Sequence, residues 1–425
     1  MFAPRGIDIR TQRIYHSGEG VSVAMIVRKI RPGEYKRCQQ LCALAFEYEM
    51  QDAALSPEAL LQRIKDHPRS MQDACWDSQW AAFEDDDRTM MATMTVIPWK
   101  ATFDGQTVCM TGIGGVASLP QYRRSGAIRA CFEAMLRDSP GACLSYLYPF
   151  STEFYRKFGY ELGCDWVKWR LRLAGMPRPE AAGSFKLAEP GNKVLLDVYA
   201  VDKPREARYN CMIRAGVVDR LYLRDDPFAT KCYTYIYYDE AGQPRSYMTV
   251  VPKDGALECP RFVFNDREGF MGLLALLMRL SADHSHATLY LPDDVDLRGV
   301  IPEWSFGNVE RTVEQRGMVR AMDVRMLLSM ARMRGEGSLR VGVHDPQIPG
   351  NDGCFEVIFA PGRTNDVRRV EAAPDIELTI QDFSRLIVGC CDLDPEWMPD
   401  VKLRCPVERA AQVFYRKPAF ISAYF

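Results

Sequence analysis

The chain has 425 residues, of which 47% are hydrophobic and 26% are charged, and its formal net charge is −2. This length exceeds that of one ordinary domain, and the composition is that of a globular protein, so two to four domains are expected. The nearly balanced charge gives no support for nucleic-acid binding or for attraction to an anionic membrane.

The sequence also bears on where the protein resides. No apolar run is long enough to span a membrane, and the first residues lack the apolar core of a signal peptide. The fourteen cysteines are dispersed, without a Cys-x-x-Cys pair, and are expected to be reduced core residues. The five histidines show no metal-ligand spacing, so no metal site is expected. Together these features predict a cytoplasmic protein.

The first part of the chain predicts an N-terminal extension followed by alternating strands and helices. Residues 1–23 are polar and aperiodic. The expected elements that follow are a strand at 25–30, helices at 35–46 and 57–66, and strands at 79–83 and 89–96. Glu47 and Glu49 come just after the first helix. They form either a solvated helix end or an acidic wall that attracts a cationic amine.

The stretch that organises this part begins with an apolar strand at 108–119. Its pair Gly114-Gly115 predicts a β-bulge that would free backbone N–H groups from the ladder. A basic turn, Arg123-Arg124-Ser125-Gly126-Ala127, leads into a helical pattern. Unpaired N–H groups and the positive dipole end make such a helix start a site for a pyrophosphate, provided that small residues allow it to approach. The alternative is an ordinary strand–turn–helix with solvated arginines.

A second motif follows about twenty residues later. Residues 142–148 read as a buried strand, and Ser151 or Thr152 is a candidate N-cap for a short helix. The segment 153–160 then contains Tyr155, which is either a core aromatic or a residue of the site.

The middle and last parts of the chain are separated from the first by a linker-like stretch at 174–184. The middle part repeats the pattern, with a helix near 204–215, strands at 232–238, 246–251 and 261–264, a helix at 271–282 and a strand at 287–291. Asp266 and Glu268 occupy the position of the basic turn, where two carboxylates would repel a pyrophosphate. The last part predicts a methionine-bearing helix at 324–334, strands at 338–343, 355–359 and 376–380, and helices at 381–390 and 407–416. Its aromatic end is expected to be buried.

These motifs resemble known sequences. Arg123 to Ala127 resembles the pyrophosphate signature of the GCN5-related N-acetyltransferases (GNAT), with Ile128 in place of a small residue, and Tyr155 to Tyr160 resembles their Phe-Tyr-x-Lys-x-Gly-Phe segment. With the terminal Phe425, the whole chain from about residue 24 resembles the "enhanced intracellular survival" (Eis) acetyltransferases. The resemblance implies an α+β protein with two GNAT folds in tandem, the second degenerate, and a sterol-carrier-protein-like domain. The implied domains are 24–172, 184–315 and 316–425.

The resemblance also implies an activity and its residues. The expected activity is transfer of an acetyl group from acetyl-CoA to a small-molecule primary amine through a tetrahedral intermediate, in a homo-oligomer that is typically a hexamer. Tyr155 is expected to be the general acid, and the Phe425 carboxylate the base or amine anchor. The acetyl-CoA site is expected to comprise Val116, Ala117, Ser118, Arg123, Arg124, Ser125, Gly126, Ala127 and Ser151.

The acceptor and the class of function stay open at this point. Aminoglycosides are acceptors of the family, but its aminoglycoside-modifying members carry an acidic residue before the terminal aromatic, and this chain has Tyr424. A monoamine or a lysine side chain is therefore the better candidate, with Glu47 and Glu49 as candidate substrate-binding residues. The alternatives are use of a longer acyl-CoA, and a binding protein for an apolar ligand whose acetyltransferase fold is only a scaffold.

Overall fold

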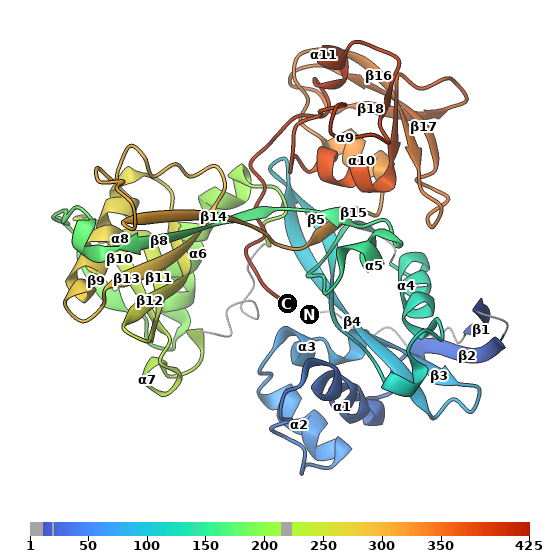
Figure 1. Cartoon of the computed structure of the whole chain (residues 1–425), viewed down its shortest axis with the longest axis horizontal. Coiled ribbons are helices and arrows are strands. Elements are labelled where there is room, and N and C mark those ends of the chain that lie inside the picture. Colours follow the sequence, from blue (N-terminus) through green and yellow to red (C-terminus); the bar gives the residue numbers. More distant parts are fainter. Residues whose placement is uncertain (1–11, 19–20, 140, 214–222) are drawn as a thin grey trace.

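A computed structural model describes residues 12–18, 21–139, 141–213 and 223–425, which form three β-sheets with packed helices. The fold is mixed α+β, as predicted. Figure 1 shows the three sheets as separate bodies, with the C-terminal trace ending beside the first of them. All fourteen cysteines are free thiols; six of them are buried, as predicted for core residues, and the other eight are half-buried.

The first sheet has eight strands. They are β1 (Gln12–Gly18), β2 (Val21–Lys29), β3 (Gln79–Glu84), β4 (Met90–Phe103), β5 (Gln106–Ser118), β6 (Ala142–Leu147), β7 (Glu161–Leu162) and β15 (Met318–Ala321). Their spatial order is β1-β2-β3-β4-β5-β6-β15-β7. The pairs are antiparallel except for β5 with β6, which is parallel and is connected through a helix.

Helices cover both faces of this sheet. They are α1 (Tyr35–Phe46), α2 (Pro57–Asp66), α3 (Met71–Ala74), α4 (Ala127–Arg137) and α5 (Thr152–Arg156). One core contains Cys38 and Leu41 of α1 with Leu60 of α2, and another contains Cys131 and Met135 of α4. The apolar spacing of α1, α2 and α4 thus places each helix on one side of the sheet. The bounds predicted for the first two helices are confirmed.

The second sheet has seven strands in the order β14-β8-β13-β12-β11-β10-β9. Its elements are β8 (Asp165–Arg172), β9 (Ser184–Leu187), β10 (Tyr233–Tyr238), β11 (Pro244–Lys253), β12 (Ala256–Phe264), β13 (His286–Pro292), β14 (Val309–Gln315), α6 (Asn192–Arg208), α7 (Pro227–Thr230) and α8 (Arg267–Arg279). The helix predicted near 204–215 is instead α6, and residues 214–215 lie outside the described residues. Pro204 suggests a helix start, where its missing N–H costs nothing, but it lies inside α6.

The third sheet and its helices form the C-terminal part of the chain. The elements are β16 (Gly337–His344), β17 (Gly353–Phe359), β18 (Asp366–Val370), β19 (Ile376–Thr379), β20 (Lys402–Leu403), α9 (Val324–Met330), α10 (Ile380–Ile387) and α11 (Val407–Ala410). The helix predicted to reach residue 334 ends at Met330. The side-chain amide of Asn365 there donates to the carbonyls of Leu328 and Ala331, 2.9 and 2.7 Å away, which satisfies groups that a longer helix would use. Within 407–416 only α11 is α-helical.

Strand pairing crosses the predicted domain boundaries in three places. Strand β8, assigned to the first domain, pairs with β13 and β14 of the second sheet. Strand β15, assigned to the last domain, pairs with β6 and β7 of the first sheet. Strand β1 lies within the predicted extension and pairs with β2, while residues 1–11 and 19–20 of that extension lie outside the described residues. The linker-like stretch after Arg172 suggested the boundary, but composition does not reveal which sheet a strand joins.

A buried ion pair fastens β15 to the C-terminal part. Arg320 and Asp345 are both fully buried, and the Nη2 of Arg320 lies 2.9 Å from the Oδ1 of Asp345. Replacing Asp345 with alanine would leave a buried, uncompensated guanidinium, and we expect it to lower the free energy of unfolding by about 3 to 5 kcal/mol. Urea unfolding monitored by circular dichroism measures this change. The exposed Asp366, paired with Arg368, provides the control, because its replacement by alanine should leave the unfolding midpoint nearly unchanged. Equal midpoints for the two variants would contradict the prediction.

Candidate active site

Toward its C-terminal end, strand β5 no longer pairs regularly with β4 or with β6. Its parallel pairing with β6 stops at Ile113 and Leu147, and its register with β4 is broken between Gly114 and Ala117. Gly115 lies within this break and has φ of +56°, a left-handed conformation that favours glycine. The β-bulge predicted from the glycine pair is therefore confirmed, and it leaves an edge of β5 that β6 does not cover.

The three residues after the bulge differ in how their side chains are placed. Val116 and Ser118 are half-buried, whereas the side chain of Ala117 is buried against the helices α1 and α2. Only Val116 of the three lines the large cavity of this domain. Backbone groups of this segment remain candidates for hydrogen bonds to an extended ligand.

The turn from β5 into α4 is glycine-capped and positively charged. Gly126 is the N-cap of α4 and has φ of +87°, and Arg124 also has a left-handed φ of +67°. Arg123, Arg124 and Arg129 are exposed, and none of them forms an ion pair with the described residues. Unpaired helix N–H groups and unpaired guanidiniums are the donors that a pyrophosphate requires, so these residues fit such a group.

The two small side chains at this helix start behave differently. Ala127 is buried beneath the first turn. The hydroxyl of Ser125 accepts a long hydrogen bond of 3.4 Å from the N–H of Ala127 and is only partly buried. The first turn thus presents little side-chain bulk toward solvent.

Tyr155 lies in α5, which begins a few residues after the end of β6. The hydroxyl of Ser151 accepts a hydrogen bond from the N–H of Phe154 at 3.3 Å, which confirms Ser151 as the N-cap. The ring of Tyr155 packs against Phe132 and Phe150, with centroids 5.8 and 5.3 Å away, and its exposed fraction is 3%. Burial raises its pKa well above the usual range. Its hydroxyl forms no hydrogen bond with the described residues, and the residue lines the large cavity.

The C-terminal residue, Phe425, lines the same cavity as Tyr155. The ring of Phe425 lies between Trp99 and Tyr148, with centroid distances of 5.7 and 5.4 Å. A methyl group on Gly112 would lie 2.6 Å from the Phe425 ring, and one on Gly114 would lie 3.5 Å from the carboxylate carbon. These glycines therefore leave the space in which the last residue sits. The end of the chain is less buried than predicted, since Phe425 is half-buried and Tyr424 is 72% exposed.

The segment before the terminus is held by the hairpin tip of the first sheet and by the middle part of the chain. The Nζ of Lys417 lies 2.6 Å from a carboxylate oxygen of Asp104 at the β4–β5 turn, and both side chains are buried. The N–H of Phe420 donates to the carbonyl of Asn210 at 2.8 Å, and the N–H of Asn210 donates to the carbonyl of Pro418 at the same distance. These contacts fix the start of the terminal segment.

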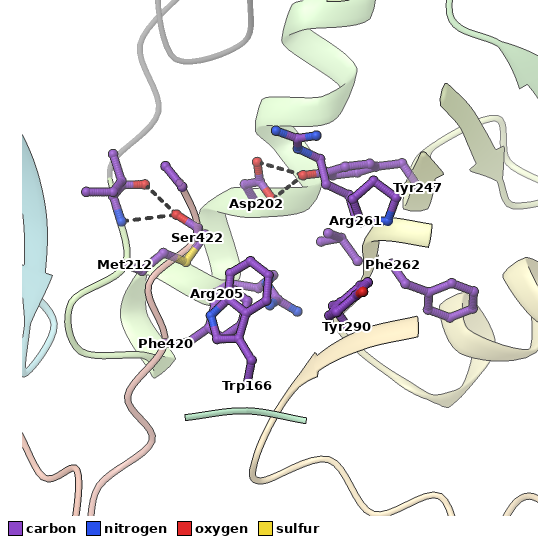
Figure 2. Close-up of a pocket in the computed structure, with 14 residues that line it drawn as sticks. Trp166, Asp202, Arg205, Met212, Tyr247, Arg261, Phe262, Tyr290, Phe420 and Ser422 are labelled. Atoms are coloured by element: carbon purple, nitrogen blue, oxygen red, sulfur yellow. Dashed lines mark hydrogen bonds between the residues drawn. The ribbon is translucent and has the colours of Figure 1, made fainter. Parts of the chain in front are cut away.

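Figure 2 shows the next contacts, around a cavity of about 70 Å³. Phe420 stacks on Trp166, with ring centroids 5.4 Å apart, and the hydroxyl of Ser422 accepts a hydrogen bond from the N–H of Ile213 at 3.1 Å. The hydroxyl of Tyr148 then donates to the carbonyl of Ala423 at 2.5 Å, just before the terminus. This cavity is far smaller than a typical ligand site, so we assign it a role in holding the terminal segment.

The large cavity has a volume of about 380 Å³ and brings the main elements together. Its wall includes Tyr155, Val116 and Phe425. Its only acidic side chain among the described residues is Asp73 of α3, not Glu47 or Glu49. The structure gives the acidic wall proposed for those two glutamates no support, because Glu47 is the left-handed C-cap of α1, Glu49 lies two residues after it, and both side chains are exposed. None of the methionines of α9 lines this cavity.

Sequence interpretation missed several residues of this wall. They come from α1, α3, β3, β4 and the loop after β6, and the described set includes Tyr35, Gln39, Phe46, Tyr48, Gln72, Asp73, Gln79, Thr95, Tyr148 and Phe150. The apolar spacing of α1 could have indicated which of its faces looks away from the core. No local signal indicated that α3, only four residues long, would contribute.

In the second sheet, the helix start that corresponds to the start of α4 carries carboxylates in place of a basic turn. Asp266 is the N-cap of α8, and its Oδ1 accepts a hydrogen bond of 2.9 Å from the N–H of Gly269. Arg245 lies between the carboxylates of Asp266 and Glu268, at 2.7 and 3.2 Å. A carboxylate thus occupies the helix start where a phosphate would bind, which supports the prediction that this half holds no pyrophosphate.

Comparisons with known proteins agree with this architecture. Residues 26–163 match the acetyltransferase (GNAT) domain family, and residues 309–396 match the sterol carrier protein domain family. The chain therefore contains a GNAT acetyltransferase domain near its N-terminus, a second GNAT-like sheet and a C-terminal sterol-carrier-like domain, which confirms the predicted fold class. No curated protein matches the chain in sequence.

Solved structures with the same fold cover 94% of this chain and all of their own length. They are a probable N-acyltransferase from Enterococcus faecalis (TM-score 0.81, 20% identity), a GCN5-related N-acetyltransferase from Anabaena variabilis (0.80, 17%) and Eis1 from Mycobacterium abscessus (0.75, 18%). At these identities the likeness establishes the fold. Among the described residues, no helix has the length and apolarity needed to cross a bilayer.

Proposed function

We propose that this protein is an Eis-type N-acetyltransferase that transfers the acetyl group of acetyl-CoA to a primary amine. The GNAT domain indicates that the protein is an acyltransferase, and GNAT domains use acetyl-CoA. One observation supports an amine acceptor. The unpaired edge of β5, the Tyr155 hydroxyl without a hydrogen bond and the terminal carboxylate of Phe425 lie around one cavity. A carboxylate attracts an ammonium, and a tyrosine hydroxyl can donate a hydrogen bond to a leaving sulfur.

Two parts of this chain would bind acetyl-CoA. Acetyl-CoA, when bound, supplies the acetyl group as a thioester. Backbone groups near Val116 would orient the extended arm of the donor and place an N–H near the carbonyl oxygen. The start of α4, with Arg123 and Arg124, would hold the pyrophosphate.

The transfer forms a bond from the amine nitrogen to the acetyl carbon and breaks the carbon–sulfur bond. The carboxylate of Phe425 would anchor the ammonium, which must first lose a proton to solvent because only the neutral amine has a lone pair for the attack. Once attack has acidified the nitrogen, the carboxylate would accept its second proton, directly or through water, and the CoA thiolate would leave and take a proton from solvent. The hydroxyl of Tyr155 would stabilise the departing sulfur. Because burial raises the pKa of Tyr155, the hydroxyl acts mainly as a hydrogen-bond donor and keeps its own proton.

Release of CoA from acetyl-CoA, measured with a thiol reagent across a panel of amines, tests this function. We expect amine-dependent release and an acetylated amine of the correct mass. A folded protein that binds acetyl-CoA but acetylates no amine would overturn the proposal. The resemblance to the Eis family also leads us to propose a hexamer, which sedimentation equilibrium would test.

Replacing Gly126 with glutamate should weaken acetyl-CoA binding by about tenfold or more. The variant places a carboxylate at the helix start, and it forces a side chain into a left-handed conformation at φ of +87°. Isothermal titration calorimetry measures the affinity. Gly242→Glu is the matched control, because Gly242 has φ of +75°, has open space around it and lies in the turn between β10 and β11. Unchanged affinity in the Gly126 variant would move the pyrophosphate site elsewhere.

A further inference from the structure

The second sheet carries a cavity that the proposed acetyl transfer does not use. It lies beside the edge strand β14 (Figure 1) and is lined by residues of β8, of β14 and of the connection from β13 to β14. Its volume of about 340 Å³ is within the range of small-molecule sites. It shares no lining residue with the large cavity of the first domain. The two cavities are therefore separate, and we call this one the β14 cavity.

Two hydrogen-bond donors in the wall of the β14 cavity lack an acceptor. Trp169 of β8 and Arg311 of β14 are cross-strand partners, and the guanidinium of Arg311 lies 5.6 Å from the centre of the Trp169 ring. Trp169 is 1% exposed, yet its indole Nε1 forms no hydrogen bond with the described residues. Arg311 is exposed and forms no ion pair with them. Because a buried N–H without an acceptor costs free energy, this pair favours a ligand that brings one.

The acidic side chains of the same wall are already paired. The carboxylate of Asp293 forms an ion pair with Arg416. The carboxylate of Asp296 accepts hydrogen bonds from the Nε and the Nη2 of Arg298, at 2.9 and 2.6 Å. Both negative charges are thus balanced by arginines of the chain. Among the described residues, Arg311 is the charged group of this wall that is left without a counter-ion, so the cavity favours an anion.

The apolar part of the wall is aromatic. The ring of Trp304 meets that of Trp169 edge to face, with centroids 5.8 Å apart and planes at 80°. The Nε1 of Trp304 donates to the carbonyl of Ile301 at 2.6 Å, which holds the ring in place while 38% of the residue stays exposed. A fixed and partly exposed indole is a surface on which a flat apolar group can stack.

We propose that the β14 cavity is a binding site for a small aromatic carboxylate. The carboxylate would pair with Arg311, whose planar guanidinium matches it through two parallel N–H donors. The Trp169 N–H would donate to it directly or through water, and the ligand ring would stack on Trp304. An ammonium or a neutral ring would leave the charge of Arg311 unpaired. The site would give the second sheet a binding role of its own, in the half of the chain whose helix start carries a carboxylate in place of a pyrophosphate site.

Titration calorimetry of the full chain with 2-naphthoate tests this proposal. We expect one molecule bound per chain, with an affinity about tenfold or more above that of the neutral 2-naphthamide. Arg311→Gln should lower the affinity for 2-naphthoate by about tenfold or more. Arg170→Gln is the control, because Arg170 is also exposed but follows Trp169 on β8 and so lies on the opposite face of the sheet, where it pairs with Glu310. Absence of saturable binding, or an equal affinity for the amide or in the Arg311 variant, would overturn the proposal.

A second pair of variants tests the aromatic contact. Trp304→Ala removes the exposed indole of the cavity and should lower the affinity for 2-naphthoate by about fivefold or more. Trp397→Ala removes an indole that is 82% exposed and lies outside the cavity, so it should leave the affinity unchanged. An unchanged affinity in the Trp304 variant would contradict the proposal. All of these experiments measure binding without turnover, so their outcome is independent of amine acetylation.

Discussion

Replacing Tyr155 with phenylalanine should lower kcat for amine acetylation by about 100-fold or more while acetyl-CoA binding stays nearly the same. The change removes only a hydroxyl that forms no hydrogen bond with the described residues, at a residue that lines the large cavity. The ring contacts with Phe132 and Phe150 are retained, so the fold should be preserved. Steady-state kinetics and titration calorimetry on the same preparation separate the two effects.

The same variant has an informative control. The hydroxyl of Tyr160 lies 2.6 Å from the hydroxyl of Ser145 in the core and does not line the cavity. Tyr160→Phe should therefore affect stability more than turnover. If both variants kept full turnover, Tyr155 would have no part in the reaction.

The pH dependence follows from burial. The pKa of Tyr155 is raised by desolvation first and by the neighbouring Tyr160 second, so the group stays protonated beyond the usual tyrosine range. We expect kcat to show no decline with the ordinary tyrosine pKa of about 10. A decline near that pH that disappears in Tyr155→Phe would show that the hydroxyl titrates normally.

Local patterns in the sequence were sufficient to predict the bulge of β5, the start of α4 and the start of α5. Gly114 and Gly115 predicted a bulge, the residues around Gly126 predicted a small, positively charged helix start, and Ser151 predicted an N-cap. Each is a short-range feature in which the residue type dictates the backbone conformation or the capping bond. Such features are readable without knowledge of the tertiary fold.

The lining of the large cavity could not be predicted in this way, because residues from elements far apart in the sequence form it. Glu47 and Glu49 follow α1 directly, yet among the described residues the acidic side chain of the cavity wall is that of Asp73, brought there by a helix of four residues. Gly112 is needed for space and not for a bulge. It leaves room for the ring of Phe425, which lies 313 positions later in the chain. The sheet that β8 or β15 joins is likewise decided by long-range pairing that no local pattern encodes.

Deleting Phe425 should reduce kcat/KM for every amine by about 100-fold or more, because it moves the terminal carboxylate, which forms no ion pair with the described residues, back by one residue. The deletion also removes a ring that packs between Trp99 and Tyr148, so loss of activity alone would not separate charge from packing. Two further variants separate them.

The first variant adds one glycine after Phe425, which keeps the ring but moves the carboxylate by about 3.5 Å. The second, Phe425→Leu, keeps the carboxylate and replaces the ring. If the carboxylate carries the function, the added glycine should cost nearly as much activity as the deletion, and the leucine variant should keep most of it.

If the leucine variant instead lost more activity than the variant with the added glycine, Phe425 would act through its ring, and the amine would be bound elsewhere. Because Trp166, Asn210 and Lys417 hold the preceding segment in all three variants, the position of the terminus is set before its last residue is reached. The comparison therefore reports on the carboxylate itself.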